Sequence, residues 1–340
     1  MPNANVILII PITVSFFITL FLVPFWIRKA HQIGLTWTDM NKNVGEKVAG
    51  SGGIIVVVGF LIGVLLYIGY NVFFLQSYNS RHIEILALLN VILLLGGLGF
   101  IDDLLGWQHG GLSKRSRLAF LVFAAIPLIV INAGRSHIAI PFVGSADIGL
   151  IYPLVFIPIG ITGATFTFNF LAGYNGLEAG QGIILLLSFA LVAFLTGNSW
   201  LSVIALCMVA ALGAFLFYNF YPARVFPGNS ITYSIGGLIA IIAILGNFEK
   251  IAVFFFIPYI IETVLKVRGK LIKQSFGKLD EDGSLSLRYN KIYGLEHVAI
   301  AFLRKVGIKS TEKNVIYSIW MFQIFIIITG FIIFRGGIFR

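Results

Sequence analysis

The chain has 340 residues, of which 58% are hydrophobic, 11% are charged and only one is Cys, and its formal net charge is +10. Soluble domains average about 25% charged residues, so a water-soluble protein of this length could not bury so much apolar surface in one core. The composition therefore argues against a soluble globular protein, and the single Cys excludes an internal disulfide.

About ten apolar runs along the chain are long enough to cross a bilayer, which takes about 20 helical residues. They predict an all-α, polytopic integral membrane protein with about ten transmembrane helices, built as a single transmembrane domain over residues 1–340. The predicted spans cover residues 5–27, 51–70, 84–101, 117–133, 150–170, 178–196, 200–217, 231–246, 250–266 and 315–334.

Basic residues collect in alternate loops. Of the 24 Lys and Arg residues, 19 fall in the loops that follow odd-numbered spans. By the positive-inside rule these loops face the cytoplasm, and ten spans then place both termini on the other side. Topology and anionic membrane lipid explain the net positive charge, so we expect no nucleic-acid partner.

The longest cytoplasmic segment, at about residues 267–314, contains two regular patterns. Residues Ser284 to Tyr289 alternate as a strand does, which predicts a small hairpin. Residues Leu295 to Val306 have the pattern of an amphipathic helix able to lie on the lipid surface. Neither pattern is large enough to indicate a second domain.

Two adjacent acids, Asp102 and Asp103, stand at the cytoplasmic end of the third predicted span. Carboxylates at a membrane edge are costly unless they are paired, solvated or bound to a metal. The pair is therefore interpreted as an Mg²⁺ or proton-handling site, with a solvated helix end as the alternative. Three bases follow that either clamp a phosphate or anchor the next span. They are Lys114, Arg115 and Arg117.

A second polar cluster separates the fifth and sixth predicted spans. Asn169, Asn175, Glu178 and Gln181 lie there in a Gly-rich stretch. An unpaired buried amide costs about 1–3 kcal/mol, and Gly lets the backbone approach a ligand closely. The cluster indicates a binding site, and hydrogen bonds between packed helices are the alternative.

Two further loops contain candidate residues. Arg224 has the geometry for a bidentate phosphate contact, and Phe226 could stack on a base. Asn229, three residues further on, is equally consistent with a helix N-cap. The stretch from Thr38 to Lys42 is typical of an ordinary loop when it is taken alone.

Taken together and in order, these four regions resemble the polyprenyl-phosphate N-acetylhexosamine-1-phosphate transferases, and the resemblance covers most of the chain. The matching motifs are Asp39-Met-Asn-Lys42, Gly99-Phe-Ile-Asp-Asp103, Asn169 to Gln181 and Arg224-Val-Phe-Pro-Gly228. The stretch Asn175-Gly-Leu-Glu-Ala-Gly-Gln181 is the most specific, and it looks like the eukaryotic and archaeal branch.

The resemblance implies a ten-span enzyme with a cytoplasmic active site, in the cell membrane of an archaeon or the ER membrane of a eukaryote. The implied reaction converts UDP-GlcNAc and dolichyl phosphate into dolichyl-diphosphate-GlcNAc and UMP, with Mg²⁺ or alternatively Mn²⁺. It is the first step of lipid-linked oligosaccharide synthesis for N-glycosylation. A homodimer is a further expectation from the same resemblance.

The resemblance also implies roles for individual residues. Catalytic roles fall on Asp102, Asp103 and Lys114. Metal ligation falls on Asp103, Asn169 and Asn229. Substrate contacts are implied for Asn41, Lys42, Asn175, Glu178, Arg224 and Phe226.

Two departures from the family pattern affect these roles. The family usually has an Asp metal ligand at the position of Asn229, and Asn offers an oxygen without a charge. The family also grips the diphosphate with a His/Arg motif in its last large cytoplasmic loop, and residues 266–314 contain no such His motif. Arg268, Lys270 and Lys273 are the expected substitutes for phosphate binding.

Three alternatives remain open. The chain could be a relative that uses another UDP-sugar or prenyl phosphate, or a catalytically silent member in which Asn229 weakens metal binding. A lipid or solute transporter is the alternative from a different class. Transporters place polar residues near the bilayer midplane, whereas these clusters lie at cytoplasmic span ends, so the transferase is favoured.

Overall fold

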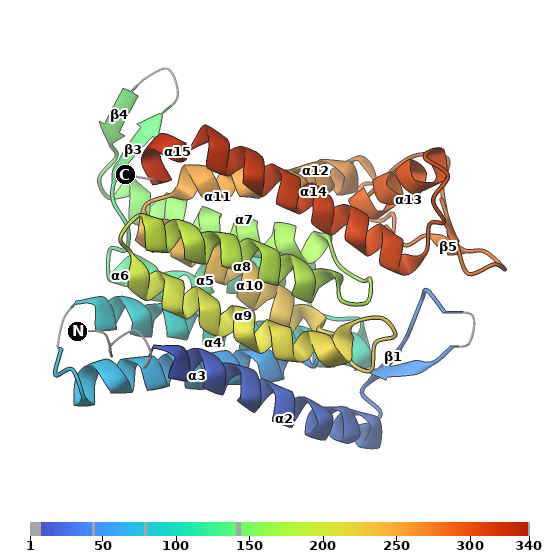
Figure 1. Ribbon diagram of the computed structural model, residues 1–340, viewed down its shortest axis with the longest axis horizontal. Helices are drawn as coiled ribbons and strands as arrows, with labels where there is room; N and C mark the ends of the chain where they lie inside the picture. The colour runs from blue at the N-terminus through green and yellow to red at the C-terminus, as the bar shows by residue number, and fades with distance from the viewer. Residues whose placement is uncertain (1–7, 43–44, 78–79, 141–143, 339–340) are drawn as a thin grey trace.

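The structure, a computed structural model, describes residues 8–42, 45–77, 80–140 and 144–338. Within these ranges the chain forms an elongated bundle of helices that run nearly side by side, with short hairpins at both ends (Figure 1). The first long helix, α2 (Ile9–Ile33), begins at the end of the bundle where the last long helix, α14 (Glu312–Ile333), finishes.

Among the described residues, eight helices are long and apolar enough to cross a membrane, which confirms the all-α, multi-pass prediction. Two of them are α2 and α14, and in a third the short π-helical turn η1 (Tyr152–Phe156) leads directly into α7 (Ile157–Phe170). The others are α3 (Gly53–Phe73), α4 (Arg81–His109), α8 (Leu177–Leu195), α9 (Ser199–Asn219) and α10 (Gly228–Gly246).

The fourth and ninth predicted spans differ from expectation because each is broken into two shorter helices. These are α5 (Lys114–Ala124) with α6 (Ile126–Val130), and α11 (Glu249–Phe255) with α12 (Ile257–Arg268). A Pro stands just after each break, Pro127 and Pro258, and Pro has no N–H to continue the helical ladder. The predicted count of about ten is therefore not confirmed, since eight helices in the described ranges meet the length needed.

The segments expected in the cytoplasm gather at one end of the bundle (Figure 1). They include the hairpin of β1 (Thr36–Thr38) and β2 (Lys47–Ala49), the hairpin of β5 (Lys278–Leu279) and β6 (Leu285–Ser286), and helix α13 (Leu295–Lys305). The last two confirm the small hairpin and the amphipathic helix predicted within residues 267–314. At the opposite end lie β3 (His137–Ile140), β4 (Gly144–Asp147) and α15 (Arg335–Ile338).

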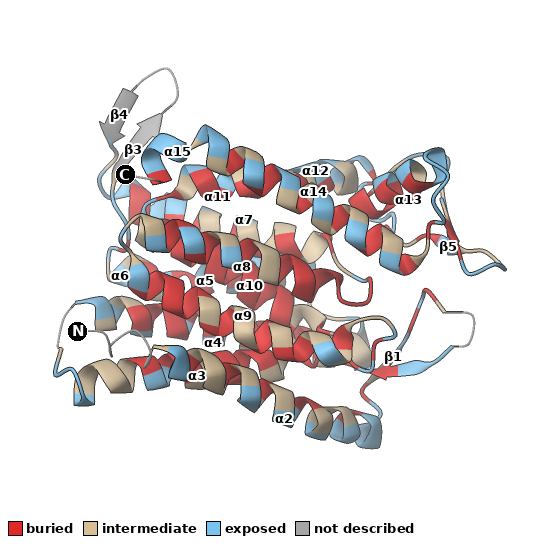
Figure 2. Cartoon of the chain, in the orientation of Figure 1, coloured by how far each residue is buried: buried red, intermediate tan, exposed pale blue. Residues whose placement is uncertain are grey.

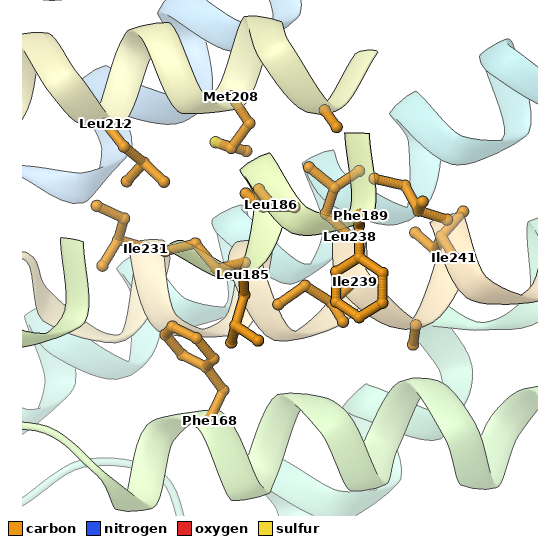
Figure 3. Packing of buried hydrophobic residues seen from close by; sticks show 14 of the residues in the cluster. Phe168, Leu185, Leu186, Phe189, Met208, Leu212, Ile231, Leu238, Ile239 and Ile241 are labelled. Atoms are coloured by element: carbon orange, nitrogen blue, oxygen red, sulfur yellow. The ribbon is translucent and has the colours of Figure 1, made fainter. Parts of the chain in front are cut away.

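Helix α10 is the centre of the bundle. In its apolar stretch 83% of the residues are buried, against 22% for the peripheral α2, and Figure 2 shows the same contrast. Phe168, Leu185, Met208 and Ile231 meet where α7, α8, α9 and α10 pack together (Figure 3). On the peripheral helix α2 large apolar side chains such as Phe21 stay exposed, as expected of a surface that faces lipid.

Helices α4 and α10 come very close at Gly99. A Cβ atom at this position would lie 2.5 Å from the backbone of Asn229, so a larger residue would push the two helices apart. The close approach places the end of α4, which carries Asp102 and Asp103, beside the first turn of α10.

Candidate active site

A cavity of about 320 Å³ opens at the end of the bundle that carries β1 and β5. Five of the residues singled out in the sequence line it: Asp103, Asn169, Glu178, Phe226 and Asn229. Other lining residues come from the β1–β2 hairpin, the turn before α3, the loop between α7 and α8, the first turns of α10 and the segment before β5. They include Trp37, Asp39, Ser51, Gly173, Tyr174, Thr232 and Phe276.

The two adjacent aspartates point in different directions. Asp103 lines the cavity, and its two carboxylate oxygens accept the backbone N–H of Asn229 at 2.8 and 3.0 Å. Asp102 instead forms an ion pair with Arg117, at 2.9 Å between Oδ2 and Nη2, and accepts hydrogen bonds from Leu112 N and Tyr233 Oη. Only Asp103 is therefore placed to meet a ligand directly.

Gly228 fixes the position of Asp103. It adopts a φ of +70°, a left-handed conformation that residues with a Cβ adopt only at a cost. A Cβ atom there would also lie 2.1 Å from Asp103 Oδ2. Glycine at the start of α10 thus lets the Asp103 carboxylate reach the backbone N–H of Asn229.

Two amide side chains complete the oxygen-rich wall. Asn229 donates from Nδ2 to Asp102 Oδ2 at 3.0 Å, which leaves its Oδ1 as the free acceptor. Asn169 Oδ1 accepts from Thr232 Oγ1 at 2.8 Å. In the described part of the chain no three His, Cys, Asp or Glu residues cluster as metal ligands, so a metal here would need these amide oxygens beside Asp103.

Behind the cavity wall lies a buried hydrogen-bonded cluster formed by Asp39, Asn41, Asn175 and Glu312. Asn41 donates from its backbone to Asp39 Oδ1 and from Nδ2 to Glu312 Oε1, at 3.0 and 3.1 Å. Asn175 donates from its backbone to Glu312 Oε1 and from Nδ2 to Asp39 Oδ2, at 2.8 and 2.9 Å. Asn41 and Asn175 therefore stand one layer behind the cavity, and Asp39 connects them to it.

Lys42 belongs to the edge of the same cluster. Its Nζ lies 2.8 Å from Glu46 Oε2 and 3.5 Å from Asp39 Oδ2. Partial burial alone would lower the pKa of Lys42, but the hydrogen bond to Glu46 and the charges of Asp39 and Glu46 outweigh it. The pKa of Lys42 consequently ends above its ordinary value, and the side chain stays cationic.

The loop between α7 and α8 closes one side of the cavity. Glu178 Oε1 accepts the backbone N–H of Gly173 at 2.8 Å, and the Tyr174 ring stacks on Phe276 with 5.9 Å between centroids. Tyr174 Oη also accepts from Gly277 N at 3.1 Å. A segment that lies about 100 residues further along the chain thus supplies a wall of the cavity.

The predicted bases lie elsewhere. Lys114 is exposed in the first turn of α5, and Arg117, one turn later on the same helix, is the base that pairs with Asp102. The remaining predicted bases are exposed and are absent from the described residues that line the cavity. They are Arg224, Arg268, Lys270 and Lys273.

Four residues that shape the site received no individual catalytic or binding role from the sequence: Arg117 and Tyr174, which lie within recognised motifs, and Phe276 and Glu312, which do not. Arg117 was part of a recognised basic motif, and its spacing of one helical turn from Lys114 was the available signal. Phe276 and Glu312 are far from the other motifs in the chain, and no local pattern distinguishes them.

The amino-acid sequence of this chain is similar to those of known proteins. The model of glycosyl transferase family 4 matches residues 85–247, a range that holds the aspartate pair, Asn169, Asn175 and Asn229. Together with the relatives described next, this match shows that the chain belongs to glycosyl transferase family 4. Its apolar helices make it a multi-pass membrane protein.

Three relatives are similar over most of the chain. The putative UDP-N-acetylglucosamine–dolichyl-phosphate N-acetylglucosaminephosphotransferase of Sulfolobus acidocaldarius is 33% identical over 93% of both chains. Its namesake from Saccharolobus solfataricus is 35% identical over 92% of both. The UDP-N-acetylglucosamine–dolichyl-phosphate N-acetylglucosaminephosphotransferase of Dictyostelium discoideum is 30% identical over 72% of this chain and 68% of its own.

Proposed function

We propose that this protein transfers GlcNAc-1-phosphate from UDP-GlcNAc to dolichyl or a related polyprenyl phosphate, giving lipid-diphosphate-GlcNAc and UMP. It would thereby begin lipid-linked oligosaccharide synthesis for N-glycosylation. The names of the three relatives support this substrate pair. The observation that carries the proposal is the convergence of Asp103, Asn169 and Asn229 from three helices on one cavity.

The distribution of charge supports an orientation with the cavity at the cytoplasmic face. The loops that contain most of the Lys and Arg residues lie at the end of the bundle where the cavity opens, and the positive-inside rule assigns this end to the cytoplasm. Both termini would then be non-cytoplasmic. A cytoplasmic nucleotide sugar and a lipid phosphate at the membrane surface would meet at this cavity.

In the proposed reaction a phosphate oxygen of the lipid attacks the phosphorus that carries the sugar. The bond from that phosphorus to the bridging oxygen breaks, and UMP leaves with this oxygen. Because both reactants are anionic, catalysis depends on positioning them and on neutralising their charge. The cavity must therefore supply both the alignment of the two phosphates and a compensating positive charge.

The donor set in the cavity fits Mg²⁺. Mg²⁺ prefers oxygen ligands and is commonly held by one or two carboxylates together with substrate phosphates. Asp103, with the amide oxygens of Asn169 and Asn229, would hold the ion, and Mn²⁺ would fit the same oxygens. When bound, the ion supplies the positive charge that lets a diphosphate enter a cavity lined by the carboxylates of Asp39, Asp103 and Glu178.

The protein's own residues would divide the remaining tasks. Asp103 would orient the lipid phosphate or accept its proton, while Asp102 holds Arg117 and the Asn229 amide in position. Phe226 and Phe276 offer aromatic surfaces inside the cavity on which a uracil ring could stack. The nucleotide would therefore lie between α10 and the segment before β5.

The proposal is tested with purified protein, radiolabelled UDP-GlcNAc and dolichyl phosphate, with Mg²⁺, with Mn²⁺ and with EDTA. We expect lipid-soluble label and UMP in equal amounts with either metal, and none with EDTA. Parallel reactions with other UDP-sugars and with undecaprenyl phosphate define the preferred substrates. Absence of lipid-linked product with every combination would overturn the transferase assignment.

A further inference from the structure

Glu312 is a buried acid with no part in the proposed chemistry. It is only 5% exposed, and it stands at the first residue of α14. Its Oε1 accepts two hydrogen bonds at once, from the backbone N–H of Asn175 at 2.8 Å and from Asn41 Nδ2 at 3.1 Å. Asn41 and Asn175 lie 134 positions apart, so Glu312 joins two loops that are distant in the chain.

Asp39 binds the same two residues from the other side. It accepts the backbone N–H of Asn41 and the side-chain amide of Asn175, so each asparagine is held by both acids. Four hydrogen bonds thereby close a ring that includes the β1–β2 hairpin, the α7–α8 loop and α14. Both loops also contribute residues to the cavity wall, Asp39 and Met40 from one and Gly173 and Tyr174 from the other.

The position of Glu312 suits a carboxylate that acts as a fixed acceptor. The N-terminus of an α-helix carries partial positive charge, which stabilises an acid in the first turn. Its second oxygen, Oε2, has no hydrogen-bond partner among the described residues. Glu312 and Asn41 also line a smaller cavity of about 200 Å³, which is large enough to admit water.

We infer that Glu312 is a positioning residue for the nucleotide half of the active site. Its carboxylate fixes Asn175 and Asn41 relative to each other, so that their two loops keep the cavity in the shape that binds UDP-GlcNAc. The inference rests on the proposed function. It predicts that loss of the acceptor impairs nucleotide binding and leaves recognition of the lipid phosphate unchanged, since Asp103, the residue proposed to orient that phosphate, lies on another helix, α4.

The test compares Glu312→Leu, which removes the acceptor at similar size, with Glu312→Gln, which keeps an acceptor oxygen without the charge. The exposed acid Glu281 of the same cytoplasmic segment provides the control variant Glu281→Gln. For each protein the Kd of UMP is measured by calorimetry, and KM for UDP-GlcNAc and for the lipid phosphate by the radiolabel assay. Thermal unfolding reports whether each variant is folded.

We expect Glu312→Leu to raise the UMP Kd and the UDP-GlcNAc KM by about tenfold or more, the size of a lost hydrogen bond to a charged group. The KM of Glu312→Leu for the lipid phosphate should stay within about twofold of the wild-type value. For Glu312→Gln and Glu281→Gln, the UMP Kd and both KM values should stay within about threefold of the wild-type values. A folded Glu312→Leu with an unchanged UMP Kd overturns the inference. An equal rise in both KM values also overturns it, as does an effect of Glu312→Gln as large as that of Leu.

If Glu312→Leu does not fold, Asn41→Ser provides the second test, because it removes one of the two donors to Oε1. An unchanged UDP-GlcNAc KM in this variant overturns the inference, and a rise of about threefold supports it. The wild-type protein separates this inference from the proposed function. If the wild type turns over and Glu312→Leu has the same UMP Kd and UDP-GlcNAc KM, only the inference is overturned. If the wild type binds UMP but does not turn over, the proposed function is overturned.

Discussion

At the residue scale, Asp102 and Asp103 are neighbours with different surroundings. Successive side chains on an α-helix point about 100° apart, so only one of the two faces the cavity. Asp103 meets the backbone of Asn229 and the cavity, and Asp102 pairs with Arg117. The consequence is that one carboxylate is available to a ligand and the other organises the residues around it.

We expect Asp103→Asn to reduce kcat by about 10²–10³-fold, a loss comparable to that from removing one group that stabilises charge in a transition state. The amide has the same shape and its oxygen can still accept from Asn229 N, so the protein should keep its thermal stability. The radiolabel assay and a thermal melt measure the two effects, with Glu281→Gln as control. Nearly normal turnover would show that Asp103 is structural.

Asn229 offers a test of the metal site. Its Nδ2 donates to Asp102, so Asn229→Asp would lose this bond and add a third carboxylate beside the pair. If Asn229 is a ligand, the added charge should lower the Mg²⁺ concentration for half-maximal activity by about tenfold, or ~1.4 kcal/mol. An unchanged Mg²⁺ titration, with Asn290→Asp in an exposed loop as control, would remove Asn229 from the ligand set.

At the element scale, α13 holds the cavity wall through His297. The backbone N–H of Tyr293 donates to His297 Nδ1 at 3.2 Å, so the neutral ring carries its proton on Nε2, which lies 3.4 Å from the carbonyl oxygen of Phe276. Burial lowers the pKa of His297 below its ordinary value, although the hydrogen bond to the Phe276 carbonyl partly opposes this. Helix α13 is thereby linked to the segment that carries the Phe276 side chain into the cavity.

This arrangement predicts a loss of local stability in acid. Because the folded pKa of His297 is lower than the unfolded one, its contribution is fully present above pH ~6.5 and is lost as the pH falls through the folded pKa. Hydrogen exchange of residues 274–280, corrected for intrinsic rates, should be faster at pH ~5 than at pH ~7.5.

Glu296 is a second titratable group beside His297, and burial and the nearby Glu262 raise its pKa. Its contribution to stability therefore depends on pH in the opposite direction. The variant His297→Gln separates the effect of His297 from that of Glu296. The variant should lose the part of the pH dependence that His297 causes. Equal dependence in the variant and the wild type would show that His297 does not titrate with the opening of this segment.

At the scale of the whole molecule, the cavity end is predicted to face the cytoplasm. Cys207 is buried, so the chain has little background for labelling with an impermeant thiol reagent. A cysteine that replaces the exposed Glu281 should react in vesicles whose cytoplasmic face is outside. It should stay protected in intact cells, or in sealed vesicles whose cytoplasmic face is inside. A cysteine at the exposed Leu75, just beyond α3, should show the reverse. Any other labelling pattern contradicts the orientation.

The broken helices show where sequence reasoning was limited. A sum of hydrophobicity over residues 117–133 or 250–266 predicts a continuous span, and the structure interrupts both beside a Pro. The hydrophobicity of a segment indicates whether it lies in lipid or in water. Whether the helix is continuous depends on individual backbone N–H groups, which Pro lacks. The hairpin at β5–β6 and helix α13 were predicted well because their alternation patterns are local.

The sequence alone indicated a multi-pass membrane protein and showed in which loops its bases collect. It also singled out Asp103, Asn169, Phe226 and Asn229 as candidate site residues, and all four line one cavity. These properties follow from composition and from motifs contained within short stretches. Only the tertiary structure decided that Asp102 turns away onto Arg117 and that Glu312 joins two distant loops. The physical reason is that a hydrogen bond or an ion pair depends on distance and direction in space, and residues far apart in a chain acquire both only when the helices pack.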